Sequence, residues 1–176
     1  MSLKPPVSER DHIQGNPNAK VELVEFGDYQ CPHCGRAYPI IKQVQEALGD
    51  QLKFVFRNFP LAEIHPQARI AAVATEAANR QGKYWEMHDI VFENQQQLRL
   101  PQLLGYARTL GLNMEQFETD IGDDALTDII DEDFESGVRS GVNGTPTFFI
   151  DGHKYTGSWE AEPLISFIRE KIAQDK

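Results

Sequence analysis

Cys31-Pro32-His33-Cys34 contains the only two cysteines of this 176-residue chain. The segment before it, Val21 to Phe26, has the largely apolar character of a buried strand. The segment after it, Gly35 to Leu48, has apolar residues at helical spacing. The stretch therefore predicts a strand that delivers a Cys-x-x-Cys pair to the first turn of a helix, which is the arrangement of a thiol redox site.

Two other interpretations of the cysteine pair are weaker. A disulfide between residues so close in sequence closes a very short loop, and the stabilisation from a cross-link grows with the loop that it closes. A zinc site needs two more ligands, and the chain has no second Cys-x-x-Cys and no His-x-x-x-His pair. We therefore expect neither a metal site nor an organic cofactor.

Composition and charge narrow the classes of partner and the compartment. The formal net charge of −10 disfavours binding to nucleic acid or to an anionic membrane surface. The sequence has no apolar run near the roughly 20 residues that span a bilayer, and its start lacks the hydrophobic core of a signal peptide. We expect a cytoplasmic protein as the chain is written, or a periplasmic or exported one if a leader has been removed.

The order of patterns predicts an α/β domain interrupted by helices. Residues 1–15 are expected to form a flexible arm, residues 16–64 and 139–176 the α/β domain, and residues 65–138 an all-helical insertion. A second strand is expected at Leu52 to Arg57, and strand, helix, strand with this spacing indicates a parallel unit. The insertion has no strand pattern, and its periodicity predicts five helices: 66–82, 84–94, 101–110, a short one capped by Asn113, and 123–138.

The last part of the chain returns to strand character. Thr147 to Ile150 and His153 to Thr156 flank Asp151-Gly152, a two-residue hairpin turn. A closing helix is expected from Ala161 to Ala173.

Two further features have chemical interpretations. Gly144-Thr145-Pro146-Thr147 lies directly before a strand, and such a proline either forms an ordinary trans turn or holds a cis peptide bond. In the cis form, it would place the backbone of Thr145 beside the cysteine pair, where a substrate chain can bind. Glu25 is either an outward-facing residue of an edge strand or a partly buried carboxylate that relays protons to Cys34.

The motif itself has a physical basis for reactivity. Amide groups in the first turn of a helix favour a thiolate on Cys31, and Cys34 lies one turn further on as a resolving thiol. His33 lies between the cysteines and would favour the thiolate further. His65, Trp85 and His88 are interpreted as packing residues of the insertion.

The whole arrangement resembles the DsbA-like branch of the thioredoxin superfamily, in its compact bacterial form. The resemblance covers about residues 16–172 and is carried by the cysteine motif, Arg57 to Leu61, Tyr84 to His88 and Gly141 to Ile150. It implies a thioredoxin fold, a central mixed sheet flanked by helices. It also implies site roles: Cys31 as nucleophile, Cys34 as resolving cysteine, Pro32 and His33 as the pair that sets the redox potential, Glu25 as buried acid, Pro39 as a helix kink, Pro146 as cis-proline and Thr145 as substrate contact.

The expected function is thiol–disulfide exchange with protein or peptide thiols through a mixed disulfide on Cys31, together with an unidentified recycling partner. Cys-Pro-His-Cys is the motif of the dithiol oxidases, whereas threonine before the cis-proline is closer to the isomerases, so the direction stays open. Two alternatives remain: a glutathione-dependent transferase or isomerase of related fold, which has no need of Cys34, and a redox-inert binding module.

Overall fold

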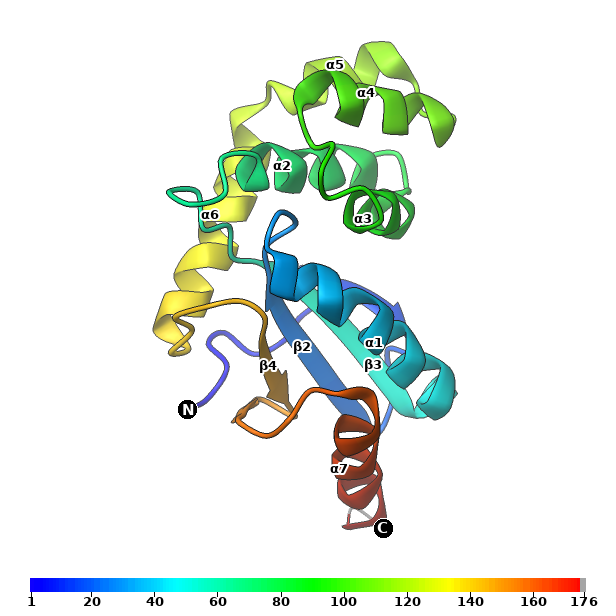
Figure 1. Cartoon of the computed structure of the whole chain (residues 1–176), viewed down its shortest axis with the longest axis vertical. Helices are drawn as coiled ribbons and strands as arrows, with labels where there is room; N and C mark the ends of the chain where they lie inside the picture. The colour runs from blue at the N-terminus through cyan, green and yellow to red at the C-terminus, as the bar shows by residue number, and fades with distance from the viewer. Residues whose placement is uncertain (175–176) are drawn as a thin grey trace. The chain divides into compact units, whose positions relative to one another are not determined.

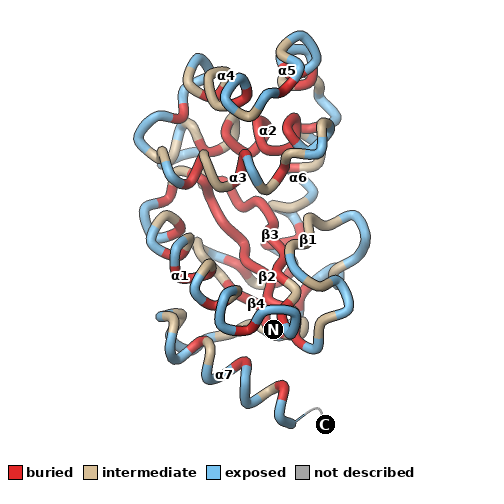
Figure 2. The backbone as a smooth tube through the Cα atoms, turned by 90° about the vertical axis from the view of Figure 1, so that its right-hand side faces the viewer, coloured by how far each residue is buried: buried red, intermediate tan, exposed pale blue. Residues whose placement is uncertain are grey.

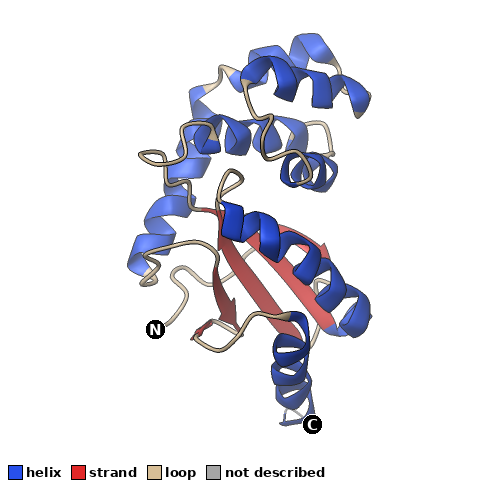
Figure 3. Cartoon of the chain, viewed as in Figure 1, coloured by secondary structure: helices blue, strands red, loops and turns tan. Residues whose placement is uncertain are grey.

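The structure, a computed structural model, describes residues 1–174, and the predicted α/β architecture is confirmed within that range. Five strands form a mixed sheet in the order β1-β3-β2-β4-β5. The strands are β1 (His12–Gly15), β2 (Val21–Gly27), β3 (Leu52–Asn58), β4 (Thr147–Ile150) and β5 (His153–Tyr155). The helices are α1 (Pro32–Leu48), a 3-10 turn (Gly49–Gln51), α2 (Ala68–Asn79), α3 (Tyr84–Phe92), α4 (Leu100–Thr109), α5 (Met114–Ile121), α6 (Asp124–Arg139) and α7 (Ala161–Gln174) (Figures 1 and 3).

The sheet is organised around β2, its central strand. β2 and β3 lie side by side and run in the same direction, joined by α1, as the strand–helix–strand pattern predicts (Figure 1). On its other side β2 pairs antiparallel with β4, and β4 pairs antiparallel with β5. The turn between them has Asp151 at φ 49° and Gly152 at φ 82°, the two positive φ angles that a tight hairpin requires. The predicted hairpin is therefore confirmed.

The chain divides into two compact units. The first consists of residues 1–27, 36–57 and those from 136 onward, and the second of residues 28–35 and 58–135. In the first, the strands form the core, and Figure 2 shows β2, β3 and β4 buried along most of their length. Apolar residues of β2 and β3 are almost fully buried, as expected for the inner strands of a sheet whose faces are covered.

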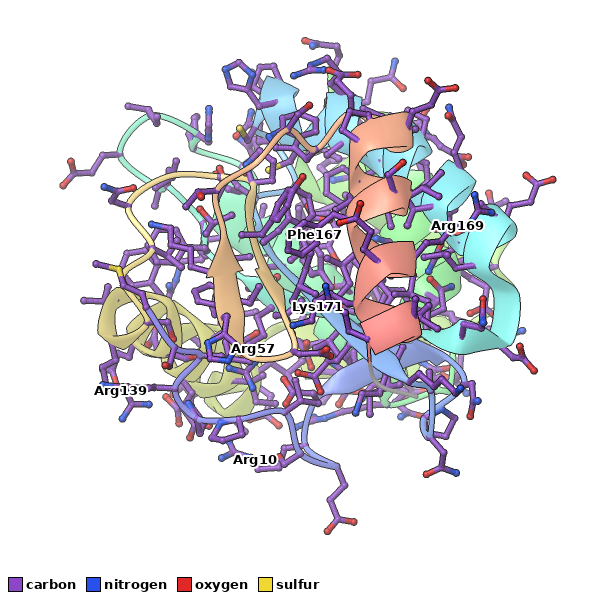
Figure 4. All side chains as sticks on the ribbon, turned by 90° about the horizontal axis from the view of Figure 1, so that it is seen from below. Arg10, Arg57, Arg139, Phe167, Arg169 and Lys171 are labelled. Carbon is purple, nitrogen blue, oxygen red and sulfur yellow. The ribbon has the colours of Figure 1, made fainter. Side chains whose placement is uncertain are left out.

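The structure corrects the expectation of a flexible arm over residues 1–15. Residues 12–15 form the edge strand β1, which pairs antiparallel with β3. Arg57, labelled in Figure 4, is 3% exposed, and its guanidinium donates to both carboxylate oxygens of Asp11, at 2.7 and 3.0 Å. It also donates to the carbonyl of Pro5 at 2.9 Å. A buried guanidinium needs such acceptors, and so this contact between residues far apart in sequence orders the N-terminal segment.

The second unit is helical, and all five predicted helices of the insertion are present. α2 is rich in alanine, and its small side chains allow close packing with α3, α4 and α5. The sequence predicts an insertion over residues 65–138, whereas the helical unit consists of residues 58–135 together with residues 28–35. The cysteine motif therefore belongs to the helical unit.

Over residues 1–174, no helix is both long enough and apolar enough to cross a membrane.

The predicted thioredoxin-type domain range extends to residue 176, and its last two residues lie outside the described part of the chain.

Candidate active site

The two cysteines lie at the start of α1. β2 ends at Gly27, a turn covers residues 28–30, and Pro32 is the first helical residue, where its missing N–H leaves no hydrogen bond unmade. Cys31 is 4% exposed and Cys34 is fully buried, whereas Pro32 and His33 are exposed. The first helical turn is closed by a hydrogen bond from the amide of Gly35 to the carbonyl of Cys31, at 3.0 Å. Cys31 thus occupies the N-terminal end of the helix, where the helix dipole favours a thiolate.

Asp28 organises the turn that leads to the motif. Its buried side chain accepts, through Oδ1, the amides of Gln30 at 2.8 Å and Cys31 at 3.2 Å. Through Oδ2 it accepts the amide of Leu61 at 2.9 Å and lies 2.7 Å from Nδ1 of His65. The amide of Asp28 in turn donates to the sulfur of Cys34 at 3.5 Å. One residue therefore makes hydrogen bonds to both cysteines and ties the turn to the loop before α2.

A buried polar cluster holds Tyr29. Its hydroxyl lies 2.8 Å from Nδ1 of His88 and 3.2 Å from the hydroxyl of Tyr84, and its ring packs against Phe92. Burial raises the pKa of Tyr84 well above its usual value, and the neighbouring Tyr29 and Glu76 raise it further. Tyr84 is therefore a neutral hydrogen-bonding group. Tyr29 is two residues before Cys31, and Tyr84, His88 and Phe92 belong to α3. The cluster therefore anchors the turn before the motif to α3.

Glu25 is buried in the middle of β2, opposite Phe148 of β4, with 3% of its surface exposed. The structure thus excludes the outward-facing edge position that the sequence left open. Gly27 makes room for it, since a Cβ at Gly27 would lie 2.9 Å from Oε2 of Glu25 and 2.5 Å from the ring of Phe56. The role of Glu25 in proton relay stays a prediction.

The Thr145–Pro146 peptide bond is cis, which confirms the less common of the two alternatives. Pro146 directly precedes Thr147, whose register partner in β2 is Phe26. The hydroxyl of Thr147 donates to the carbonyl of Gly144 at 2.7 Å and closes the turn that carries the proline. Substrate binding by Thr145 and Pro146 stays a prediction.

The predicted site residues fall into two groups. Cys31, Pro32, His33 and Cys34 belong to the helical unit, and Glu25, Thr145 and Pro146 belong to the unit built on the sheet. Pro39 lies inside α1, as expected. Within residues 1–174, no cluster of three or more His, Cys, Asp or Glu side chains has the arrangement of a metal site.

Three residues around the motif were not predicted from the sequence: Asp28, Gly35 and Gln95, whose side chain donates to the carbonyls of Tyr29 and Cys31. The sequence predicts packing roles for His65 and His88; the His88 ring does pack against Tyr29 and Phe92, and both histidines also hydrogen-bond the turn at residues 28–29. For Asp28 a signal existed, because aspartate at the start of a turn typically accepts the amides two and three residues on. For Gln95 no local signal exists, since its partners are more than 60 residues away in sequence.

Comparison with known proteins places this geometry in a family. A family model described as "Thioredoxin" matches residues 7–170. Among curated proteins, the Na⁺/H⁺ antiporter NhaA 1 of Salinispora arenicola is 39% identical over 165 residues, which are 94% of this chain and 25% of that protein. NhaA 1 of Mycobacterium sp. (strain KMS) is 41% identical, over 93% of this chain and 27% of that protein. The chain thus spans about a quarter of the length of these relatives.

Solved structures give the same assignment. A thioredoxin-like oxidoreductase from Silicibacter pomeroyi is 28% identical, with a TM-score of 0.83 over 96% of this chain and 95% of that one. BdbD from Bacillus subtilis, 22% identical, has a TM-score of 0.84 over 96% of both chains. Wolbachia pipientis alpha-DsbA1, also 22% identical, has a TM-score of 0.84 over 96% of this chain and 94% of that one. Because the family model covers most of the chain, this chain belongs to the thioredoxin family, and its fold has the DsbA-like form.

Proposed function

We propose that this chain is a thiol–disulfide oxidoreductase that acts on protein or peptide thiols. The observation that carries the proposal is the placement of Cys31 and Cys34 in the first turn of α1, with Asp28 bonded to both residues. A helix N-terminus stabilises a thiolate and so makes the first cysteine both a good nucleophile and a good leaving group. The family match and the 28% identical oxidoreductase support the same chemistry.

The exchange proceeds in two displacement steps. A substrate thiolate attacks Sγ of Cys31 in the oxidised pair, the Cys31–Cys34 bond breaks, and Cys34 leaves as a thiolate. A second substrate thiolate then attacks the substrate sulfur of the mixed disulfide, and Cys31 leaves as a thiolate. Two electrons and two protons pass from the substrate to the enzyme, and the reverse order reduces a substrate disulfide.

Each remaining site residue has a proposed role in this cycle. Cys34 is buried and lies one helical turn from Cys31, which suits it to resolve the mixed disulfide rather than to meet substrate first. His33 and Pro32, both exposed between the cysteines, adjust the potential of the pair. Glu25 accepts or supplies the proton of Cys34, and the backbone of Thr145 ahead of Pro146 binds the substrate chain.

Two serine variants test the proposal against its alternatives. Catalysed oxidation and reduction of a dithiol peptide should require both cysteines, so Cys31→Ser and Cys34→Ser should each lose turnover. Loss in Cys31→Ser alone would instead support a glutathione-dependent transferase or isomerase. If the wild-type protein does not raise the rate above that of the uncatalysed reaction, the redox-inert binding module is the supported alternative.

The binding role of Thr145 has its own test. A substrate peptide is trapped on Cys31 of the Cys34→Ser variant, and amide hydrogen exchange is compared with that of the untrapped variant. Slower exchange at the amide of Thr145 supports backbone binding. Unchanged exchange there contradicts it.

The equilibrium reduction potential against glutathione decides the direction. A value well above about −180 mV indicates an oxidase, and a value near about −270 mV indicates a reductant.

The partner is a separate proposal. The relatives that share 39–41% identity are named as Na⁺/H⁺ antiporters, and only about a quarter of each resembles this chain. We infer that one partner is a transporter of that kind. Oxidised wild-type protein added to vesicles that contain such an antiporter should change its transport rate, and Cys31→Ser should not. Equal effects of the two proteins would contradict this partner.

A further inference from the structure

Gln95 bridges two carbonyl groups of the turn that carries Cys31. It lies in the loop after α3, and its side-chain nitrogen Nε2 donates to the carbonyl of Tyr29 and to the carbonyl of Cys31, each at 2.9 Å. The carbonyl of Cys31 also accepts the amide of Gly35 at 3.0 Å. Both lone pairs of this oxygen are therefore used, and both hydrogens of the Gln95 amide are used. The bridge fixes the backbone on either side of Gln30.

Gly35 explains how Gln95 reaches this position. Gly35 lies inside α1, where alanine is the better helix former. A Cβ at this position would overlap Oε1 of Gln95 and lie 2.6 Å from its Cδ. The absence of a side chain at residue 35 is thus a requirement for space. A residue next to the second cysteine and a residue in a distant loop depend on each other.

The bridge also affects charge at the nucleophile. The NH₂ end of an amide is the positive end of its dipole, and Gln95 directs it at the backbone of Cys31. A carbonyl that accepts two hydrogen bonds opposes a nearby thiolate less than an unbonded one does. The loop that carries Gln95 is itself closed by a bond from the amide of Gln97 to the carbonyl of Asn94 at 2.9 Å, so the donor is held in place before substrate binds.

We infer that Gln95 is a positioning residue for Cys31, that Gly35 is a glycine in order to admit it, and that the two together set the reactivity of the nucleophile. The inference rests on the proposed thiol–disulfide exchange and deepens it. Gln95 acts through the backbone of Cys31, and it neither forms nor breaks a bond with substrate.

The test compares Gln95→Glu with Gln96→Glu. Both substitutions add one negative charge to the same loop, but Gln96 is exposed and lies one residue further along the chain. In Gln95→Glu a carboxylate oxygen would face two carbonyl oxygens, so the carbonyl of Cys31 loses a hydrogen bond and the thiolate gains a repulsive charge nearby. We expect the thiolate fraction of Cys31 at pH 5 to 6, measured by ultraviolet absorbance, to fall roughly threefold to tenfold. In Gln96→Glu it should change by less than about twofold.

A second pair of variants isolates the dependence between Gly35 and Gln95. Gly35→Ala and Gln95→Met should each slow the observed reaction of Cys31 with oxidised glutathione at pH 5 to 6, because each lowers the thiolate fraction, and the double variant should be no slower than the slower single variant. Non-additivity of this kind is the mark of two changes that remove one interaction. Circular dichroism checks that each variant is folded. If Gln95→Glu is not folded, the uncharged variants Gly35→Ala and Gln95→Met provide the test.

The outcomes separate the inference from the function on which it rests. Equal thiolate fractions in Gln95→Glu and Gln96→Glu, or fully additive losses in the double variant, overturn the positioning role of Gln95. Absence of exchange activity in the wild-type protein and in Gln96→Glu overturns the proposed function instead.

Discussion

Replacing Asp28 by asparagine should separate two effects that the structure combines in one carboxylate. The side chain is fully buried and meets four donors: the amides of Gln30, Cys31 and Leu61, and the ring of His65. Asparagine has one acceptor oxygen and one NH₂ group, so two of the four donors would face another donor. A buried donor without its acceptor costs about 1–3 kcal/mol. The free energy of unfolding should therefore fall by about 2–6 kcal/mol.

The same substitution should make Cys31 more reactive. It removes a negative charge whose oxygen lies 3.2 Å from the amide nitrogen of Cys31, and loss of a nearby negative charge favours a thiolate. We thus expect a less stable protein with a larger thiolate fraction on Cys31. For a domain of this size, about 2–4 °C per kcal/mol converts the stability loss into a Tm decrease of roughly 5–20 °C.

The assay combines thermal unfolding, followed by circular dichroism, with a thiolate titration of Cys31. Asp131→Asn is the matched control, because Asp131 is half exposed and pairs with Arg69 on the surface of the same unit, where an ion pair contributes at most about 1 kcal/mol. The reasoning is refuted if Asp28→Asn unfolds at the control temperature, or if its thiolate fraction is smaller than that of the wild type.

Three other predictions concern stability and its pH dependence. Asp11→Asn should lower the free energy of unfolding in urea by about 3 kcal/mol, because the buried guanidinium of Arg57 loses its charge partner; a loss below about 0.5 kcal/mol would count against it. Burial raises the pKa of Tyr84, so the folded state binds that proton more tightly, and the resulting stability is present below about pH 10 and lost at higher pH. Urea unfolding at several alkaline pH values should show a shallower loss in Tyr84→Phe, and parallel curves would contradict this. A hydrogen bond from the amide of Ala125 and one from a neighbouring guanidinium lower the pKa of Asp123. The contribution of Asp123 to stability is therefore present above about pH 4 and lost as the pH falls. Titration of Asp123 by nuclear magnetic resonance should give a midpoint below that of an unstructured aspartate, and an equal midpoint would argue against this prediction.

The parts of the fold that were predictable from the sequence have local causes. The helix after the motif and the helices of the insertion follow from apolar residues at helical spacing. The hairpin follows from Asp151-Gly152, whose residues adopt the positive φ angles of a tight turn. The cysteine motif was recognisable because strand, turn and helix adjoin it in sequence.

The parts that were missed depend on contacts between distant segments. Arg57 is 46 residues from Asp11, and the ion pair between them, together with the pairing of β1 and β3, holds the N-terminal segment. The apolar pattern of that segment is too short and too polar to predict a strand. Gln95 is 64 residues from Cys31, and nothing in its neighbourhood distinguishes it from Gln96 or Gln97. The motif likewise belongs to the helical unit, although it directly follows a strand of the other unit in the chain.

The central claim, that Cys31 is the nucleophile and Cys34 the resolving cysteine, is tested most directly by trapping. Each single serine variant is mixed with a peptide that carries an activated disulfide, and the adducts are identified by mass spectrometry. The account predicts a stable mixed disulfide on Cys31 in Cys34→Ser, formed quickly at pH 6, and little adduct on the fully buried Cys34 in Cys31→Ser. Equal adduct formation on both cysteines, or faster formation on Cys34, would contradict it.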